Sequence, residues 1–291
     1  MCKINPRVDF AFKLIFGNEQ NKDILISLLN AILEDYQSYP IESIEILNPL
    51  GSQEYSKDKL TILDIKAKDQ KGEFYNIEMQ ISDQYYYQKR ALYYWSKLYT
   101  SQISEGIGYQ NLTRTVRINI LNFNAIKEVD YHNVYRVREL KKNIDLTEQL
   151  EIHFIELEKF SKELPELKKT MDRWIYFLKY ADKFTETNLP EVLKEIQPIE
   201  KANVILDRIS LNKEQREIYE ARMKSLRDAD GALQTARIRG LEEGMEKGME
   251  KSKIEVAGKL LEKKFSVEEI CEITGLSEDE IRSLNRDFRD L

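Results

Sequence analysis

Residues 60–81 constrain the fold of this chain more than any other stretch. Apolar and polar residues alternate over 60–68 and again over 74–81, and the segment Asp69-Gln70-Lys71-Gly72 between them is typical of a turn. We therefore predict an antiparallel β-hairpin with a four-residue connection.

The hairpin brings acidic side chains together. Successive side chains of a strand point to opposite faces, so each strand carries a polar set on one face: Asp64, Lys66 and Lys68 on the first, and Asn76, Glu78 and Gln80 on the second. Folding about Gln70-Lys71 brings Asp64 roughly level with Glu78 or its neighbour. Two converging carboxylates suit a hard cation such as Mg²⁺. The same alternation is also typical of a solvated outer face, and spacing alone leaves both interpretations open.

These residues carry a family resemblance. Asp64-Ile-Lys66, Gly72 and Asn76-Ile-Glu78-Met-Gln80 resemble the active-site hairpin of the PD-(D/E)XK nuclease superfamily. The resemblance is narrower to the Rpn family of recombination-promoting nucleases and putative transposases, which typically carries E-x-Q where other members carry E-x-K. The flanking segments 9–16 and 90–94 match as well. The resemblance covers residues 5–125 well and the C-terminal third more loosely.

The resemblance implies a metal site. In such a site Asp64 and Glu78 bind Mg²⁺ or another divalent cation, and the backbone carbonyl of Met79 is a further ligand. Gln80 stands where the superfamily has a lysine that orients or deprotonates the attacking water. Glutamine can hydrogen-bond that water but cannot carry charge. This departure concerns the rate and the number of metal ions rather than the reaction class.

Further residues have implied roles around the metal. Asp9 lies on a helix that in such folds touches the metal through water. Three cations are candidates for contacts with DNA phosphate, although Arg90 is equally suited to a structural salt bridge with Glu78: Lys13, Lys66 and Arg90. Lys66 shares the face of Asp64 and could replace the missing lysine, whereas strand-face lysines are usually just solvated.

The implied function is a Mg²⁺-dependent DNA endonuclease associated with recombination or transposition. Two alternatives stay open. The first is a catalytically weak DNA-binding or regulatory protein that keeps the nuclease fold. The second is a scaffold protein that acts through self-association of its C-terminal helices.

The remaining pattern predicts an α/β fold in which helices flank a mixed central sheet, as in restriction endonucleases. Further strands are expected at 41–47, 114–123, 131–138 and 150–157. Amphipathic helices are expected at 9–16, 21–33, 85–103, 165–181, 191–196, 199–209 and 213–227. The polar connection 50–59 leads into the Asp64 strand and is expected near the substrate.

The helix at 85–103 is rich in tyrosine. Its stripe Tyr86, Arg90, Tyr93, Lys97 and Thr100 fits either core packing or a platform for stacking bases, and aromatic residues at this spacing more often belong to a core. We accordingly expect Tyr93 and Tyr94 to serve packing first.

The C-terminal part has a different character. We divide the chain into a nuclease domain with a helical extension (1–235), a helical connector (236–264) and a small helical module (265–291). Glycine recurs every four residues at 240, 244 and 248, which favours an exposed connector or a self-association strip. Two capping boxes follow, at Ser266 and Ser277. The pattern resembles a helix-turn-helix, but its second helix begins with three acids, so homodimerisation or regulation is expected rather than DNA reading.

Composition narrows the setting. No apolar run is long enough to span a membrane, and the N-terminus lacks the features of a signal peptide. Two cysteines at opposite ends of the chain suit the cytoplasm. The net charge is −6, yet residues 84–142 carry ten Lys and Arg against four Asp and Glu, which is compatible with phosphate contacts. The two histidines lack neighbours at metal-ligand spacing, and nucleotide-binding motifs are absent.

Overall fold

A computed structural model describes residues 3–48, 64–83, 85–106, 108–127 and 130–287. It consists of two compact units, Met1–Leu226 and Arg227–Leu291. The expected connection at 50–59 lies outside the described residues.

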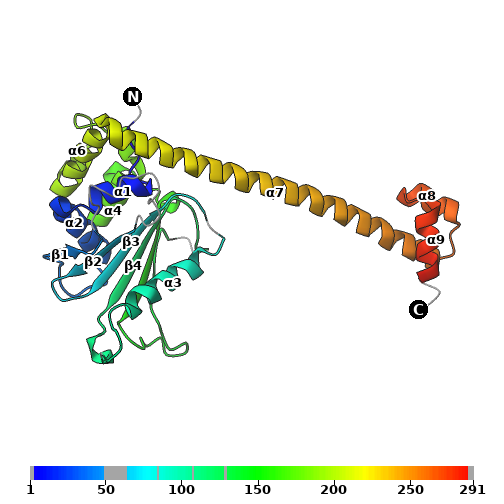
Figure 1. The fold of residues 1–291 in the computed structure, drawn as a ribbon, viewed down its shortest axis with the longest axis horizontal. Coiled ribbons are helices and arrows are strands. Elements are labelled where there is room, and N and C mark those ends of the chain that lie inside the picture. The colour runs from blue at the N-terminus through cyan, green and yellow to red at the C-terminus, as the bar shows by residue number, and fades with distance from the viewer. Residues whose placement is uncertain (1–2, 49–63, 84, 107, 128–129, 288–291) are drawn as a thin grey trace. The chain divides into compact units, whose positions relative to one another are not determined.

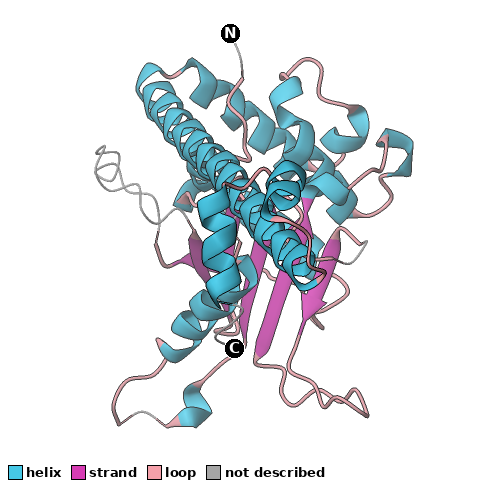
Figure 2. Cartoon of the chain, turned by 90° about the vertical axis from the view of Figure 1, so that its right-hand side faces the viewer, coloured by secondary structure: helices cyan, strands magenta, loops and turns pink. Residues whose placement is uncertain are grey.

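The first unit is built on one mixed six-stranded sheet with the strand order β1-β2-β3-β4-β6-β5 (Figures 1 and 2). The strands are β1 (Ile44–Ile46), β2 (Ile65–Asp69), β3 (Phe74–Gln80), β4 (Thr115–Leu121), β5 (His132–Tyr135) and β6 (Leu150–Glu156). Pairing is antiparallel between β1, β2 and β3, parallel between β3, β4 and β6, and antiparallel between β6 and β5. The mixed sheet flanked by helices confirms the predicted fold class.

The predicted hairpin is confirmed. β2 and β3 pair antiparallel around a turn in which Gly72 has a φ of 83°, a conformation that side-chain-bearing residues rarely adopt. The Asp69 carboxylate closes this turn by accepting the backbone N–H groups of Lys71 and Glu73, both at 2.9 Å. The turn thereby fixes the register of the whole ribbon.

One face of the sheet is covered by α1 (Asp9–Phe16), α2 (Lys22–Leu33) and α4 (Thr170–Tyr180), as Figure 1 shows. Seven of the eight α1 residues are buried because the helix is apolar almost all round. Side chains of Phe12, Leu28 and Trp174 pack in one cluster with Ile65 and Ile77 of the hairpin. Helices α5 (Glu191–Lys194) and α6 (Gln197–Leu211) extend this layer.

The opposite face carries α3 (Tyr87–Thr100), the crossover between the parallel strands β3 and β4. Its inner side packs Tyr87, Ala91 and Trp95 on Ile152 and Phe154 of β6. The expectation of a tyrosine core is only partly correct, because four tyrosines of this segment are at least 41% exposed: Tyr85, Tyr86, Tyr93 and Tyr94. The helix needs one apolar side to cover the sheet, and these tyrosines lie outside that side.

The C-terminal part is helical. A single helix, α7 (Lys213–Glu262), joins the two stretches that the sequence pattern suggested separately. It is followed by α8 (Val267–Thr274) and α9 (Glu278–Asp287), and both predicted capping boxes are present. Short 3₁₀ turns lie at Glu19–Asn21, Tyr109–Asn111, Leu157–Lys159, Leu164–Glu166 and Ala181–Lys183. Among the described helices, none is long and apolar enough to cross a membrane.

Candidate active site

The hairpin register sets Asp64 against Glu78. Ile65 pairs with Ile77, so the next position places Asp64 level with Glu78, and opposed residues of an antiparallel pair share a face. The side-chain amide of Asn76 donates a hydrogen bond to Oδ2 of Asp64. The polar residues of the two strands therefore meet on the face that α3 covers.

Two arginines hold the Glu78 carboxylate. Nη2 of Arg90, on α3, donates to Oε1 at 2.7 Å, and Nη2 of Arg117, on β4, donates to Oε2. The Arg117 side chain is only 1% exposed, and that of Glu78 is 11% exposed. Each carboxylate oxygen thus has a cationic donor, which fixes the orientation of Glu78.

Arg117 connects Glu78 to the two neighbouring asparagines. Its guanidinium also donates to Oδ1 of Asn76 and, from Nε, to Oδ1 of Asn119 at 3.0 Å. Asn76 passes the connection on to Asp64 through its own amide. Sequence reasoning assigned Arg117 no role, although an arginine inside a strongly apolar strand is an available signal, since buried arginine is rare unless it is paired.

A small cavity opens beside Asp64. Its volume is about 100 Å³, and it is lined by Asp64, Lys66, Asn76, Tyr94, Lys97, Leu98 and Ser101. Oδ1 of Asp64 is buried and has no hydrogen-bond partner among the described residues. A buried carboxylate oxygen without a donor is costly, and a cation at that oxygen would satisfy it. This one oxygen is suited to a cation, whereas Lys66 and Lys97 also line the cavity and Glu78 does not.

The residues next to Glu78 lie on both faces of β3. Gln80 is half-buried on the same face, and its amide donates to the Ser82 carbonyl at 3.2 Å. The Met79 side chain is buried on the opposite face, where it joins the apolar core. Lys66 lines the cavity beside Asp64 and is the cation of the hairpin closest to it in sequence.

Asp9 and Lys13 both lie on α1. The Asp9 carboxylate is held by Arg222 of α7, whose Nε donates to Oδ1 at 3.0 Å. Lys13 is 3% exposed on α1, the helix that packs on the other face of the sheet. Within the described part of the chain, no three His, Cys, Asp or Glu side chains are grouped closely enough to hold a metal ion. The site therefore rests on the Asp64–Glu78 pair and its neighbours.

A second buried polar cluster occupies the α2 side of the sheet. Glu151 of β6, 0% exposed, accepts from Nη2 of Arg114 at 2.7 Å and from Nε of Arg136 at 2.6 Å. Nε2 of His153 contacts the same carboxylate at 2.8 Å, and Nδ1 of His153 lies 2.9 Å from Nε2 of His132. The two histidines, far apart in sequence, meet because β5 pairs with β6.

Burial and the neighbouring charges determine the protonation of Glu151 and the two histidines. Burial alone would raise the pKa of Glu151, but the hydrogen bond from His153 and the nearby cations outweigh burial and lower that pKa to about 2. Burial lowers the pKa of His132 to about 3 and also lowers the pKa of His153, against the pull of Glu151. Both imidazoles are therefore neutral, so His153 donates to Glu151 and His132 donates to His153.

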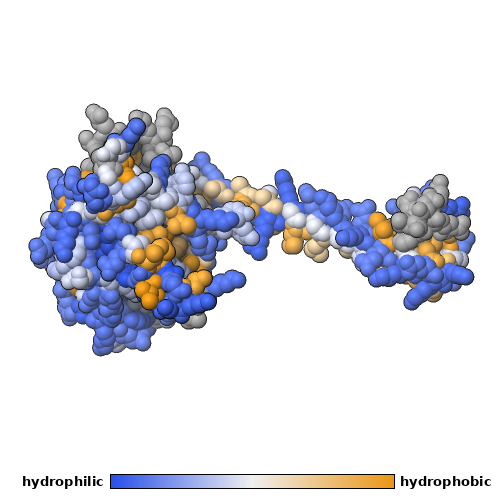
Figure 3. All heavy atoms as spheres, turned by 90° about the horizontal axis from the view of Figure 1, so that it is seen from below, coloured by the Kyte–Doolittle hydropathy of each residue, from blue (hydrophilic) through white to orange (hydrophobic). Residues whose placement is uncertain are grey.

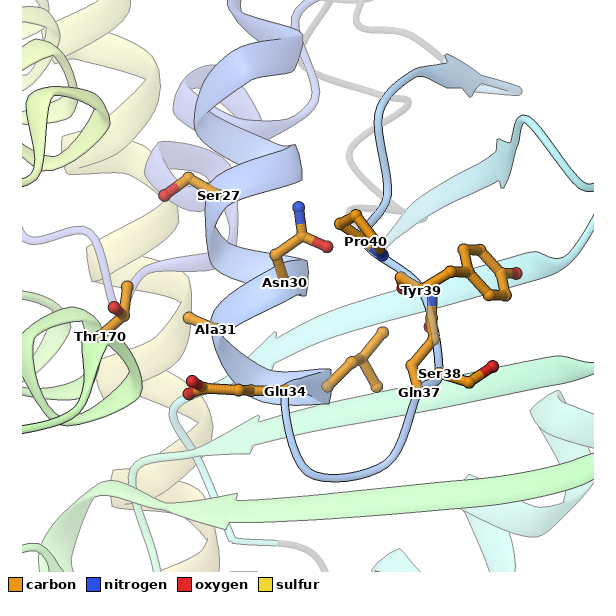
Figure 4. Close-up of a pocket in the computed structure, with 10 residues that line it drawn as sticks. Ser27, Asn30, Ala31, Glu34, Gln37, Ser38, Tyr39, Pro40 and Thr170 are labelled. Carbon is orange, nitrogen blue, oxygen red and sulfur yellow. The ribbon is translucent and has the colours of Figure 1, made fainter.

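A wider pocket of about 500 Å³ lies between α2, the loop after it and the start of α4. Figure 4 shows Asn30 facing the loop that carries Tyr39 and Pro40. The Asn30 amide is already used, because it exchanges two hydrogen bonds with the backbone of Ile41. Glu34 is the one carboxylate among the described lining residues, so this pocket lacks the paired acids found at the hairpin.

Comparison with known protein families gives a match over most of the chain. A family model described as PD-(D/E)XK nuclease family transposase matches residues 6–236, which is more than half of the chain and includes the whole Asp64–Glu78 hairpin. No curated protein and no solved structure matches the chain.

Proposed function

This chain belongs to the PD-(D/E)XK nuclease family transposases, and from this premise we propose that it is a Mg²⁺-dependent DNA endonuclease acting in recombination or transposition. One observation supports this proposal above the others. The hairpin sets Asp64 against Glu78 on one face, and Asp64 keeps a buried oxygen without a donor among the described residues.

The metal is proposed to lie between the two acids. Asp64 Oδ1, the Glu78 carboxylate and the Met79 carbonyl supply hard oxygen ligands, which Mg²⁺ prefers. A bound divalent ion polarises a phosphodiester oxygen and lowers the pKa of a water molecule. Asp9 is not a direct ligand in this proposal, because Arg222 holds its carboxylate.

The other residues orient the reactants. Gln80 hydrogen-bonds the attacking water, and Lys66 supplies the positive charge that glutamine lacks. Arg90 either keeps its ion pair with Glu78 or turns to a DNA phosphate, and its planar donor group suits both partners. Lys13, buried on α1, has no part in the proposed phosphate contacts.

The test is the nicking of supercoiled plasmid by the full chain in the presence of Mg²⁺. We expect nicking that stops when the metal is chelated and in the variants Asp64→Ala and Glu78→Ala. Glu34→Ala, which removes a carboxylate from the other side of the sheet, is the matched control and should cleave as the wild type does. Nicking that persists without Asp64 would remove the proposed site.

A second candidate is a DNA-binding protein with little or no cleavage. The observation that favours it is the engagement of both Glu78 oxygens by arginines, combined with glutamine at position 80. In this case the wild type binds plasmid but never nicks it, and the two alanine variants still bind.

We also propose that the C-terminal helices self-associate. The alternative function as a scaffold protein depends on the same self-association. Three large apolar side chains on α7 are 60–64% exposed, namely Leu241, Met245 and Met249. Figure 3 shows apolar groups along this helix between hydrophilic ones. The neighbouring glycines at 240, 244 and 248 have no described atom in their way, so a second helix could approach closely. We propose that the protein works in the cytoplasm as a homodimer formed in this way.

Removing residues 240–291 tests this assignment. We expect the truncated chain to lose its dimeric state or change its activity, while the sheet-containing unit, which is compact by itself, stays folded. Sedimentation that still shows a dimer would assign the interface to another surface.

A further inference from the structure

Helix α3 exposes aromatic rings next to the proposed active site. Tyr86 at its N-cap and Tyr93 in its middle are 62% and 60% exposed, and Tyr94 is 41% exposed. These rings are outside the cluster that packs α3 on the sheet. Large aromatic surfaces left in water on a helix that already has a buried side are a feature that packing does not explain.

The exposed rings form one face with basic side chains. At 3.6 residues per turn, Tyr86, Lys89, Tyr93 and Lys97 lie along one stripe of the helix, about 16 Å long. Tyr94 lies between this stripe and the side of the helix that packs on the sheet. We use the name α3 outer face for the four residues of the stripe together with Tyr94.

The α3 outer face runs into the Asp64 cavity. Tyr94 and Lys97 line that cavity together with Asp64. The Tyr94 ring also lies under the guanidinium groups of Arg90, at 5.5 Å, and Arg117, at 5.4 Å. A ligand that lies along the helix therefore meets, at Tyr94 and Lys97, the cavity that Asp64 also lines.

The charge of this face selects an anion. Residues 85–104 contain three cations and no acid, in a chain whose net charge is −6. Lys89 lies 5.0 Å from the centre of the Tyr86 ring, so positive charge and aromatic surface are interleaved. A second copy of this face would be repelled by the first, whereas a polyanion is attracted.

We propose that the α3 outer face binds an unpaired DNA strand by stacking its bases on Tyr86 and Tyr93, with Lys89 and Lys97 along the phosphates. The inference rests on the proposed function, because it delivers the strand to Asp64 and Glu78. It deepens that function by naming the substrate class, DNA with a single-stranded stretch. Bases in a duplex are stacked on each other, so tyrosine faces have partners only where the strand is unpaired.

The test measures binding apart from cleavage. The full chain is titrated, with a chelator present and at fixed salt, into labelled oligothymidine and into a duplex of the same length, and fluorescence anisotropy is recorded. We expect Tyr86→Ala and Tyr93→Ala each to weaken single-strand binding about tenfold and to leave duplex binding unchanged. Tyr93→Phe, which keeps the ring, should bind as the wild type does. Tyr109→Ala removes another exposed tyrosine, outside α3, and should have no effect.

Three results would overturn the proposal. Equal weakening for duplex and single strand would assign the face to paired DNA. Unchanged single-strand binding would remove nucleic acid from this face, and an altered sedimentation coefficient in the tyrosine variants would assign the face to self-association. Plasmid nicking by the wild type together with any of these results leaves the proposed function standing. Tyrosine-dependent binding without nicking leaves only the binding face.

Discussion

Two buried glutamates on opposite faces of the same sheet invite comparison. Glu78 of β3 and Glu151 of β6 are each held by two arginines: Arg90 and Arg117 for the first, Arg114 and Arg136 for the second. In both cases a carboxylate removed from water is stabilised by paired guanidinium donors. By residue type and pairing alone the two clusters are nearly the same.

Their surroundings differ. Glu151 is closed on every side, because His153 and His132 extend its hydrogen bonds and no exposure remains. Glu78 instead lies level with a second acid, Asp64, which has a buried oxygen without a described donor and a cavity beside it. We therefore expect the complete cluster around Glu151 to contribute mainly to the stability of the fold, and the incomplete one around Asp64 and Glu78 to contribute mainly to the proposed ligand binding.

Neutralising Asp64 should separate the functions of the two clusters most clearly. We expect Asp64→Asn to reduce plasmid nicking on the order of 10³-fold, because a neutral amide lacks the negative charge with which the carboxylate would hold the proposed cation. Its free energy of unfolding should stay within about 1 kcal/mol of wild type, since the bond with Asn76 can persist. Asp145→Asn, at a surface ion pair, is the control. Unaltered nicking in Asp64→Asn would indicate that the cluster around Glu78, like that around Glu151, has only a structural role.

The converse change is Glu151→Gln. It removes one of two carboxylate partners from each of Arg114 and Arg136, which keep their ion pairs with Glu73 and Asp145. We expect a loss of roughly 1.5–3 kcal/mol in the free energy of unfolding, measured in urea. Nicking per folded molecule should be unchanged, because this cluster lies on the other face. Glu34→Gln, an exposed carboxylate, should cost little. A stable Glu151→Gln protein that no longer nicks would contradict the division of roles.

The closed cluster should also respond to acid. The pKa values of His132 and His153 are lower in the folded chain than the usual 6.5, so the unfolded chain binds more protons as the pH falls below 6.5. Stability should then decrease by about 1.4 kcal/mol per pH unit for each proton concerned. Urea titrations over a range of pH measure this slope, and His132→Gln should reduce it. An equally steep slope in His132→Gln would show that His132 does not contribute to the acid sensitivity.

A change at Gln80, two residues after Glu78, should alter nicking less than the change at Asp64. Gln80→Lys restores the residue found in most of the superfamily, and we expect nicking to rise about tenfold because a cation can activate the attacking water. Gln110→Lys adds the same charge at an exposed turn and serves as the comparison. A decrease in Gln80→Lys would indicate that the surrounding arginines already supply the charge this site can accept.

Local pattern predicted the local part of the site. Alternation around Asp69–Gly72 predicted the hairpin and placed Asp64 level with Glu78 or its neighbour, because these features depend on residues close in sequence; the structure fixes the register at Glu78. The amphipathic stripe of α3 was likewise visible, but the exposure of Tyr86 and Tyr93 was not. Which tyrosines of α3 are buried depends on which side of the helix packs on the sheet. The sequence pattern is compatible with either of two sides.

The remaining features depend on pairing between distant segments. Arg117 meets Glu78 only because β4 lies parallel to β3, and His132 meets His153 only because β5 returns beside β6. Asp9 shows the same dependence on distant segments, because its ion-pair partner Arg222 lies 213 residues away. Periodicity describes one element at a time and cannot reveal such partners.

The Glu78–Arg117 pair has a consequence for the order of events in synthesis. Its two residues are separated by 39 positions and by the whole of α3, so the glutamate leaves the ribosome well before its buried partner. Closing such a loop costs entropy that is repaid only when β4 docks. The acid pair can thus be oriented only after the crossover has folded, and a nascent chain that ends before β4 carries the two acids proposed to bind metal without the arginine that orients Glu78.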